Sequence, residues 1–505
     1  MKPLKYILLV AALLCVAGCN LEENPDYFTN RKNFFKTVNQ CRSAADACYL
    51  CINDIYTSSF AHIAESCSDI CVSWQVQQDA ELNVTPSYPR FGATVWKQGY
   101  KGVMYCNFAI EGLEHSAIDE ATRKEYIAES KIMRALYYYV LTCTFGDVPF
   151  YTVDVADNKI MEQVQRLPRT SATDIRRALI EDLEGCVADL PQIRGSEVGE
   201  YRAGAALGLM LIAKMAMWNG SKEQSGAEYW WEKAIAALEQ LRAIYGSLGS
   251  YSLEENMLWH KKNTPESIFE IQHKYIAGGT NYTSSLAAVM HPQHGESGTD
   301  IFDGIAIPWL GANGRTWASI RPNTYFFRQL QPRGGADRRT AYNMAWEYNG
   351  VRFNSTASRP WMGIKFWCPD MTNYYDHNNY KIFRYADAVL MLAECYAETG
   401  KADKALLSLN EVKQRAGIAL CSETAHDALI EEIRAERARE LIGEFQRKFD
   451  LVRWGIWYER LMQYNNNTDT TGNAKPCHEY YPIPDVQCEY SGGALNNDEY
   501  KKYGL

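Results

Sequence analysis

The chain has 505 residues, and its 52 Lys and Arg stand against 61 Asp and Glu, which gives a formal net charge of −9. Nucleic-acid binding needs a concentrated basic face, so this charge balance argues against a nucleic-acid partner. The length exceeds what one compact core usually spans, and we therefore expect several subdomains or an extended repeat scaffold.

The first residues predict a secretory signal that ends in a lipid-attachment site. The stretch MKPLKYILLVAALLCVAGCN carries two lysines, an apolar run and then small residues before Cys19. This run is too short and wrongly flanked for a stable transmembrane helix. Val16-Ala17-Gly18-Cys19 matches a bacterial lipobox, in which the Cys19 thiol takes the lipid. We expect a body tethered to a membrane by acyl chains without crossing it, and the alternative is an ordinary signal with an incidental cysteine.

Cysteines form an array that superficially resembles a zinc site, consisting of Cys48, Cys51, Cys67 and Cys71. The surrounding sequence predicts helix, with the two members of each pair one turn apart, whereas zinc knuckles usually hold CxxC in a tight turn. We interpret the four as small buried hydrophobes rather than as ligands or disulfides. The pair Cys477 and Cys488 brackets a loop and could form a disulfide.

Helical periodicity runs through most of the chain, first over residues 121–145 and then over residues 171–190. Residues 202–246 and 385–417 each predict two helices around a turn, in the manner of tetratricopeptide repeats. In the second pair, a small residue in each helix lets the two helices approach closely. Long insertions separate the pairs, so we expect a scaffold rather than a regular binding solenoid.

Two segments lose the helical period and are rich in Trp, Tyr, Arg and Asn: residues 73–96 and 250–380. Long irregular loops in a compact domain are usually functional. A glycan site needs aromatic platforms for sugar C–H groups and planar polar side chains for hydroxyls. The candidates that these segments offer are Trp74, Tyr88, Arg90, Tyr282, Trp309, Asn313, Arg315 and Trp317.

The stretch PWLGANGRTW, residues 308–317, is the best of these candidates, because two Trp flank an Arg on a Gly-rich loop. The alternative is that one or both Trp only pin the loop to the core. His291 and His294 have HxxH spacing, but the intervening proline disrupts a helical pair, so we predict no metal site there.

The segment Ile433–Gly455 is dense in both acids and bases. Written as one helix, it has an apolar side and exposed charge pairs, each worth a few tenths of a kcal/mol. A catalytic interpretation would need a pocket and a carboxylate of raised pKa, and the sequence indicates neither. We therefore interpret the segment as scaffold.

Six stretches carry a resemblance to a known family. In chain order they are VWKQGYKGVMYCNFAIEGL, AESKIMRALYYYVLTCTFGDVPF, RPNTYFFRQLQPRGGADRR, FRYADAVLMLAECYAETG, IRAERARELIGEFQRKFDLVRWG and YYPIPDVQCEYSGGALNNDEY. Together with the lipobox, they resemble the SusD/RagB family of outer-membrane nutrient-binding lipoproteins from Bacteroidetes. The sequence departs from the family pattern at Asn496, where Gln is usual, and at Phe445-Gln446, which replaces a common Gly.

The resemblance implies an all-α scaffold of about four tetratricopeptide-like helix pairs with an irregular, loop-rich ligand-binding subdomain. It also implies a lid-like role over a SusC-like TonB-dependent transporter at the cell surface, with the outer membrane holding the lipid anchor. Such a protein captures an oligosaccharide, or sometimes a peptide, and passes it to the transporter without chemistry or a cofactor. The competing hypotheses are a glycoside hydrolase with paired acids and a scaffold that binds only protein.

The same reasoning divides the chain into regions. Residues 1–18 are the signal peptide with its lipobox, residues 19–220 the N-terminal SusD-like helical region, and residues 221–265 a connecting helix pair. Residues 266–505 form the C-terminal RagB/SusD region, which includes the loop-rich insertion 270–380.

Overall fold

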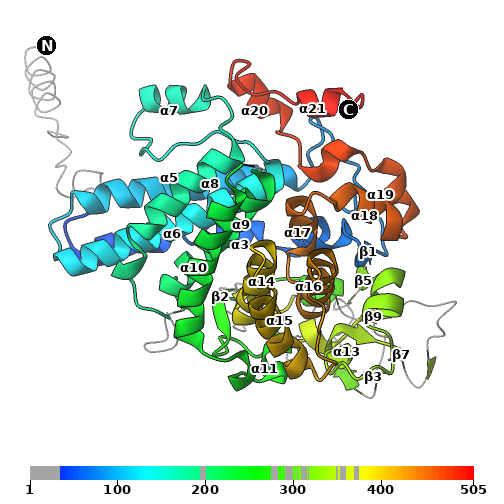
Figure 1. Ribbon diagram of the computed structural model, residues 1–505. Coiled ribbons are helices and arrows are strands. Elements are labelled where there is room, and N and C mark those ends of the chain that lie inside the picture. Colours follow the sequence, from blue (N-terminus) through cyan, green and yellow to red (C-terminus); the bar gives the residue numbers. More distant parts are fainter. Residues whose placement is uncertain are drawn as a thin grey trace, which may run out of the picture.

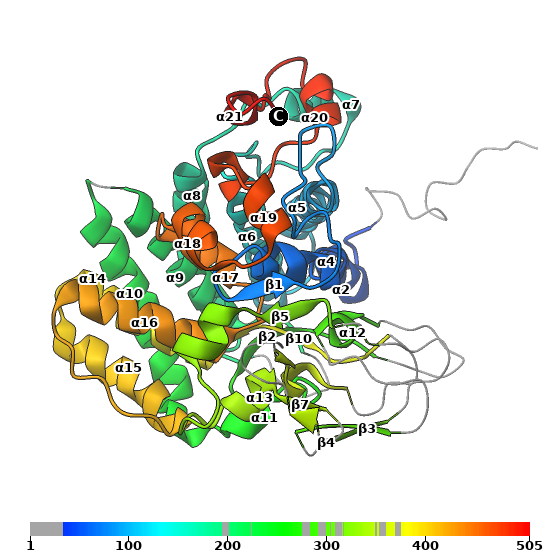
Figure 2. The same ribbon diagram turned by 90° about the vertical axis from the view of Figure 1, so that its right-hand side faces the viewer.

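The computed structural model describes residues 34–193, 201–223, 225–274, 283–290, 299–303, 305–308, 316, 318–348, 351–352, 360–368 and 375–505. Helices build the body of the molecule, and short strands gather on one side of it (Figures 1 and 2). One large hydrophobic core runs through the helical part and reaches the strands.

The N-terminal part is a set of short helices packed on one long antiparallel pair. Its elements are α2 (Val38–Ala47), α3 (Ile52–Ile55), α4 (Ser58–Ala61), the π-helix η1 (His62–Ser66), α5 (Gly92–Glu114) and α6 (Glu120–Phe145). Helix α2 begins at a capping box, in which Thr37 and Gln40 satisfy each other's backbone donors. Helices α5 and α6 pack closely because Gly102 leaves room for the Tyr137 ring; a Cβ at Gly102 would lie 2.3 Å from it.

Further helices stack beside this pair as successive antiparallel hairpins. They are α8 (Ala172–Glu184), α9 (Ala205–Lys222), α10 (Ala227–Tyr245), α14 (Tyr385–Glu398), α15 (Ala402–Ala416), α16 (His426–Leu441), α17 (Arg447–Arg453) and α18 (Trp457–Tyr464). Helix α10 packs on both α9 and α14, although α14 follows 140 residues later in the chain. The predicted all-α, tetratricopeptide-like scaffold is confirmed, as are the helix pairs within residues 202–246 and 385–417.

The remaining helical elements are short. They are α7 (Asn158–Gln165), η2 (Val187–Asp189), η4 (Leu248–Ser250), α11 (Leu253–Met257), α12 (Leu286–Met290), the π-helix η5 (Phe326–Leu330), α13 (Thr340–Asn343), η6 (Ile364–Phe366), α19 (Thr468–Asn473), η7 (Pro476–Glu479), α20 (Asp485–Tyr490) and α21 (Asp498–Lys501). None of the described helices is long and apolar enough to cross a bilayer.

The strands pair across long sequence separations. They are β1 (Cys71–Ser73), β2 (Ser267–Ile271), β3 (Thr299–Phe302), β4 (Ile305–Pro308), β5 (Ile320–Pro322), β6 (Met344–Ala345), β7 (Glu347–Tyr348), β8 (Val351–Arg352), β9 (Trp361–Met362) and β10 (Tyr380–Arg384). β1 pairs with β5, β2 with β10 and β6 with β9, and the fourth sheet has the order β4-β3-β7-β8. All the pairings are antiparallel.

The acid- and base-rich segment Ile433–Gly455 is not the single helix that its sequence predicts. Helix α16 ends at Leu441, and the backbone then turns through left-handed conformations at Gly443 (φ +80°) and Phe445 (φ +60°) before α17 begins at Arg447. The break is stabilised by the buried Glu65 carboxylate, which accepts hydrogen bonds from the backbone N–H groups of Gly443 and Gln446 in this turn.

Most charged side chains of this segment are also buried rather than exposed, which overturns the predicted exposed pairs. Arg339 Nη1 donates to Glu436 at 2.7 Å and to Glu440 at 2.8 Å, and all three side chains are fully buried. Arg384 donates to Glu440 at 2.7 Å and to Glu444 at 2.9 Å. These guanidinium groups hold the pKa of Glu440 well below its usual range. The segment is an internal charge network that joins α16 to β10 and to the loop before α13.

The four N-terminal cysteines occupy turns and a strand rather than helices. Cys48 is the C-cap of α2, Cys51 is the N-cap of α3, Cys67 follows η1 and Cys71 lies in β1. Their predicted burial is confirmed, and the structure holds them as free thiols, as it does Cys477 and Cys488. Burial raises the pKa of Cys67 to about 12, which keeps this thiol protonated. Within the described residues, no cluster of three or more His, Cys, Asp or Glu is placed to hold a metal ion.

Candidate functional site

A two-stranded ladder brings together the two irregular segments that the sequence marks as functional. β1 pairs with β5 in the register Cys71 to Pro322 and Ser73 to Ile320. Both strands are buried, and the Trp74 N–H extends the ladder by donating to the Ser319 carbonyl at 2.6 Å. The pairing is visible in Figure 2, where β1 and β5 lie side by side beneath the helices. Trp74 therefore lies at the end of the ladder, next to Ser319, which follows the Trp-rich stretch at residues 308–317 in the sequence.

Trp74 presents an aromatic face supported by an arginine. Its side chain is 54% exposed, and the Arg321 guanidinium carbon lies 4.3 Å from its ring centroid. The same guanidinium lies 5.6 Å from the ring of the half-buried Trp361 in β9. Arg321 is only 7% exposed and is oriented by its Nε, which donates to the Ala318 carbonyl at 2.9 Å. A cation stacked on an indole face is worth about 0.5–2 kcal/mol, so the Trp74 ring is held in place.

This arrangement, which we call the Trp74 platform, consists of Trp74, Arg321 and Trp361. An indole that stacks on a guanidinium through one face can offer its other face to a ligand. Sugar rings present C–H groups to such a face and hydroxyls to nearby polar groups. The platform is therefore suited to a ring-shaped ligand that has an apolar face and polar edges.

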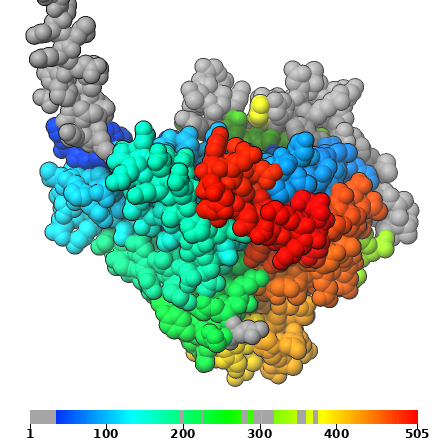
Figure 3. Space-filling view, turned by 90° about the horizontal axis from the view of Figure 1, so that it is seen from above, coloured from blue at the N-terminus to red at the C-terminus, as the bar shows by residue number. Residues whose placement is uncertain are grey.

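Tyr88 and Arg90, predicted from the same segment, lie at a different surface. The chain after Trp74 runs away from the strands toward α20, where Ser87 Oγ donates to the Asp485 carboxylate at 2.6 Å (Figures 2 and 3). Tyr88 is 64% exposed there. Arg90 donates from Nε to the Asn83 carbonyl at 3.0 Å and lies 5.4 Å from the Tyr88 ring. Arg90 thus braces its own loop, and Tyr88 is the exposed aromatic of this second surface.

The base of the loop is fixed by a buried carboxylate. Asp79 Oδ1 accepts from the Phe91 N–H at 3.2 Å and from the Tyr481 hydroxyl at 3.0 Å. Burial raises the pKa of Asp79 to about 6, against the opposing effect of these two donors. The ends of the segment are therefore tied to the helical body, while Trp74 and Tyr88 project from it.

Five predicted site residues fall outside the described residues, and they stay predictions: Tyr282, Trp309, Asn313, Arg315 and Trp317. The lipidation candidate Cys19 also falls outside them. Sequence reasoning missed Arg321 and Trp361. A signal that could have indicated Arg321 is the RP that follows WASI after the Gly-rich loop, because an arginine next to an aromatic-rich loop is placed to stack. The sequence carries no comparable signal for Trp361.

Comparison with known families gives matches at both ends of the chain. A profile described as the SusD family matches residues 309–500, and one described as starch-binding and associating with the outer membrane matches residues 21–203. Among curated relatives, a SusD-like protein of Formosa agariphila is 26% identical over 452 residues, which cover 80% of this chain and 78% of the relative. The starch-binding protein SusD of Bacteroides thetaiotaomicron is 23% identical over 496 residues, which cover 86% and 84%.

Solved structures share the fold over almost the whole chain. A laminarin-binding SusD-like protein superposes with a TM-score of 0.71 at 19% identity and covers 90% of this chain and 98% of its own. Surface glycan-binding protein A from Bacteroides uniformis superposes with a TM-score of 0.70 at 23% identity and covers 92% of this chain and 100% of its own. With the two profiles, the relatives and the shared helical scaffold all in agreement, the chain belongs to the SusD/RagB family.

Proposed function

We propose that the protein is a binding lipoprotein of the cell surface that captures an oligosaccharide and delivers it to a SusC-like TonB-dependent transporter, without catalysing a reaction on it. The observation that carries the proposal is the Trp74 platform. An exposed indole, held by the buried Arg321, is preorganised for a sugar ring and costs little conformational entropy on binding.

The comparisons support the class of ligand. One matching profile is described as starch-binding, one relative is named a starch-binding protein, and one solved neighbour is titled laminarin-binding. All three descriptions name the binding of a glycan. Specificity within that class depends on loop geometry rather than on the scaffold.

The membrane part of the proposal rests on the sequence and on the family description. The lipobox ending at Cys19 supports a lipid anchor, and the profile over residues 21–203 is described as associating with the outer membrane. A receptor tethered in this way needs a transporter through which its ligand crosses the membrane, and the SusC-like barrel fills that role in the proposal.

Isothermal titration of the protein from Asn20 onward against plant, host and microbial oligosaccharides tests the proposal. We expect saturable binding to at least one glycan, lost or weakened at least about tenfold in Trp74→Ala. Tyr229→Ala, which removes another exposed aromatic ring on α10, is the matched control and should bind normally. The thermal melts of both variants should match that of the unsubstituted protein.

Other results of the titration would favour a different site or a different function. Binding that survives Trp74→Ala but is lost in a Trp309→Ala, Trp317→Ala double variant would move the site to the loop at residues 308–317. No binding to any glycan, with binding to a peptide panel, would favour a peptide receptor. No binding to either, with a transporter still copurifying, would favour a lid or scaffold without ligand affinity of its own. Turnover of a glycan by the pure protein would contradict the absence of catalysis.

A further inference from the structure

A buried histidine lies behind the Trp74 platform and contacts the chain just before β5. His62 begins the π-helix η1, and its Nε2 lies 3.1 Å from Ser319 Oγ. Its Nδ1 lies 3.2 Å from Ser66 Oγ. Burial lowers the pKa of His62 to about 4, so the ring is neutral and has one nitrogen that donates and one that accepts. Because a serine hydroxyl can do either, both ring nitrogens have a partner.

The backbone next to this contact is held in a left-handed conformation. Ala318 has a φ of +43° and is fully buried, and residues with a Cβ rarely adopt this conformation. Such strain persists only where neighbouring contacts hold the backbone in place. Here the Ala318 N–H donates to the Ala288 carbonyl at 3.3 Å, and the next residue, Ser319, is held by His62.

The two residues held in this way position both parts of the platform. The Ala318 carbonyl accepts from Arg321 Nε at 2.9 Å, and the Ser319 carbonyl accepts from the Trp74 N–H at 2.6 Å. The guanidinium that supports the indole and the backbone that carries the indole therefore share one anchor. A change of backbone conformation at Ala318 would reorient the carbonyl that holds Arg321.

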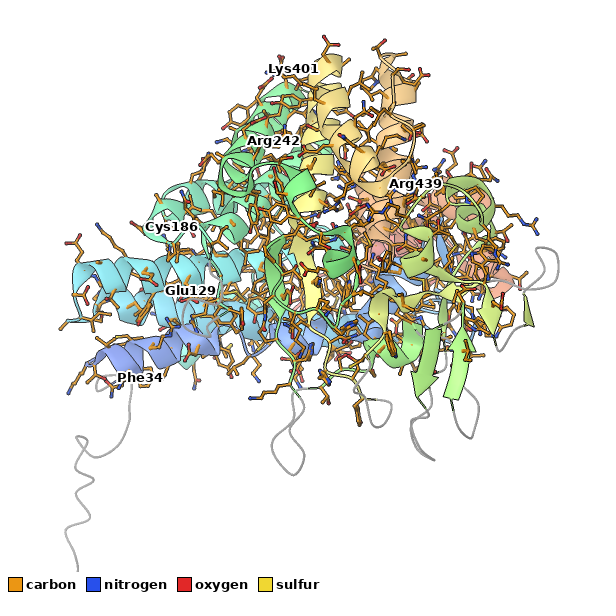
Figure 4. All side chains as sticks on the ribbon, turned by 90° about the horizontal axis from the view of Figure 1, so that it is seen from below. Phe34, Glu129, Cys186, Arg242, Lys401 and Arg439 are labelled. Atoms are coloured by element: carbon orange, nitrogen blue, oxygen red, sulfur yellow. The ribbon has the colours of Figure 1, made fainter. Side chains whose placement is uncertain are left out.

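His62 is a firm support because η1 is fixed to the core at its other end. The Glu65 carboxylate accepts from the backbone N–H groups of Gly443 and Gln446, at 3.1 and 3.0 Å. These N–H groups belong to the turn that follows α16, the helix on which Figure 4 labels Arg439. The π-helix also packs on both β1 and β5 (Figure 2). It thus joins the core to the ladder, and π-helical turns are frequent at functional sites.

The burial of His62 argues against a catalytic role for this side chain. A histidine beside a serine resembles the base and nucleophile of a hydrolase. However, Ser66 and Ser319 are fully buried and His62 is only 2% exposed, so a glycan does not reach these hydroxyls. The three side chains therefore act on the backbone around them rather than on a ligand.

We propose that His62 is a positioning residue of the glycan site. By holding Ser319, it keeps the strained backbone at Ala318 in the conformation that orients Arg321 and Trp74 toward a ligand, and it does not touch the ligand itself. The inference rests on the proposed function of the Trp74 platform, and it adds that the affinity of this platform is set from behind, by a side chain of η1.

Two variants separate the two contacts of the imidazole ring. The Gln amide lies as many bonds from Cα as the Nε2 of histidine, so His62→Gln keeps a group that reaches Ser319. The Asn amide matches Nδ1 instead, so His62→Asn reaches Ser66 but leaves Ser319 without this partner. His478→Asn is the matched control, because His478 is also a buried histidine, at 3% exposed, but lies in η7.

The first measurement needs no ligand. In protein labelled with 5-fluorotryptophan, the fluorine NMR resonance of Trp74 is the one that Trp74→Phe removes. We expect this resonance to move or broaden in His62→Asn and to keep its position in His62→Gln and His478→Asn. The second measurement is isothermal titration with maltohexaose, laminarihexaose and the tightest oligosaccharide of the panel above. His62→Asn should weaken binding at least about tenfold, and His62→Gln should stay within about threefold.

A Trp74 resonance that does not move in His62→Asn would overturn the inference. So would an affinity that His62→Asn leaves unchanged, or that His62→Gln lowers equally. If His62→Asn does not fold, Ser319→Ala removes the same contact from the other side and should move the resonance in the same way. A resonance that moves in a protein that binds none of the glycans would keep the positioning role of His62 and count against the proposed function.

Discussion

Two regions of this molecule use arginine in opposite ways. In the core, Arg384 of β10 is fully buried and pairs with the carboxylates of Glu266, Glu440 and Glu444. Its charge therefore holds other parts of the chain to this strand. At the Trp74 platform, Arg321 stacks on rings, and the indole that it supports remains exposed. The comparison teaches that a charged cluster in the sequence marks scaffold here, whereas a single arginine beside aromatic residues supports an exposed aromatic face, the surface that we propose binds the glycan.

The sharpest test of the comparison is to remove the core arginine. Arg384→Met leaves Glu266, Glu440 and Glu444 without their shared partner in the core. Breaking a buried ion pair on one side costs about 3–5 kcal/mol, so we expect at least this loss in the free energy of unfolding. Chemical denaturation measures it. A loss below about 1 kcal/mol would mean that the network is not structural.

The close packing of α5 on α6 gives the next largest effect. Gly102→Ala places a Cβ within 2.3 Å of the Tyr137 ring, and Tyr137 is itself fixed because its hydroxyl donates to the Cys48 carbonyl at 2.7 Å. We expect a loss of about 1–3 kcal/mol from overpacking. Gly472→Ala, at a glycine with nothing within 4 Å of the added Cβ, is the matched control and should be nearly neutral.

A buried carboxylate next to the core network gives a pH-dependent effect. Glu65 accepts from the backbone N–H groups of Gly443 and Gln446, at 3.1 and 3.0 Å, and burial raises its pKa to about 7. Because this pKa lies above the unfolded value, the native state binds the proton more tightly, and the contribution is fully present below about pH 4.5 and declines as the pH rises through about 7.

Thermal melts of the protein and of Glu65→Gln, compared from pH 4.5 to 8, measure this effect. The stability of the unsubstituted protein relative to the variant should fall as the pH rises across this window. A difference that stays constant, or that grows with pH, would contradict the raised pKa.

The smallest effect on stability is expected at the platform, where the effect on binding is largest. Trp74→Ala removes a half-exposed ring, so we expect the free energy of unfolding to change by about 1 kcal/mol or less while glycan affinity falls. Arg321→Lys keeps the charge but loses the planar stacking group, and it should weaken glycan binding less than Trp74→Ala does. If Trp74→Ala lowered the free energy of unfolding as much as it lowered the free energy of glycan binding, the platform would be structural, as the core network around Arg384 is.

The helical scaffold could be predicted from the sequence because apolar residues recur at three- and four-residue spacing within each helix. Residues 202–246 and 385–417 form the helix pairs that their apolar spacing indicates. The prediction for Ile433–Gly455 was wrong both in the single helix and in the exposed charge pairs. Neither the left-handed turn at Phe445 nor the burial of Glu440 leaves a periodic signal in the sequence. Burial of charge depends on partners that lie far away in the chain.

The candidate site was predictable only by composition. An aromatic-rich irregular segment marks Trp74 as a candidate, and the structure places its ring in an exposed position. Arg321 and Trp361 come from strands too short to be recognised, and their position depends on the β1–β5 and β6–β9 pairings. Closeness in sequence groups Tyr88 and Arg90 with Trp74, whereas the structure places their part of the loop against α20.

The β1–β5 ladder has a consequence for how the protein matures. Its two strands lie almost 250 residues apart, one within each of the two matched family regions. Contacts of such high sequence separation are slow to form, because closing the long loop between them costs conformational entropy before the contact stabilises the chain. A nascent chain that does not yet include β5 therefore has no Trp74 platform, and an intact platform reports that the two family regions have already come together.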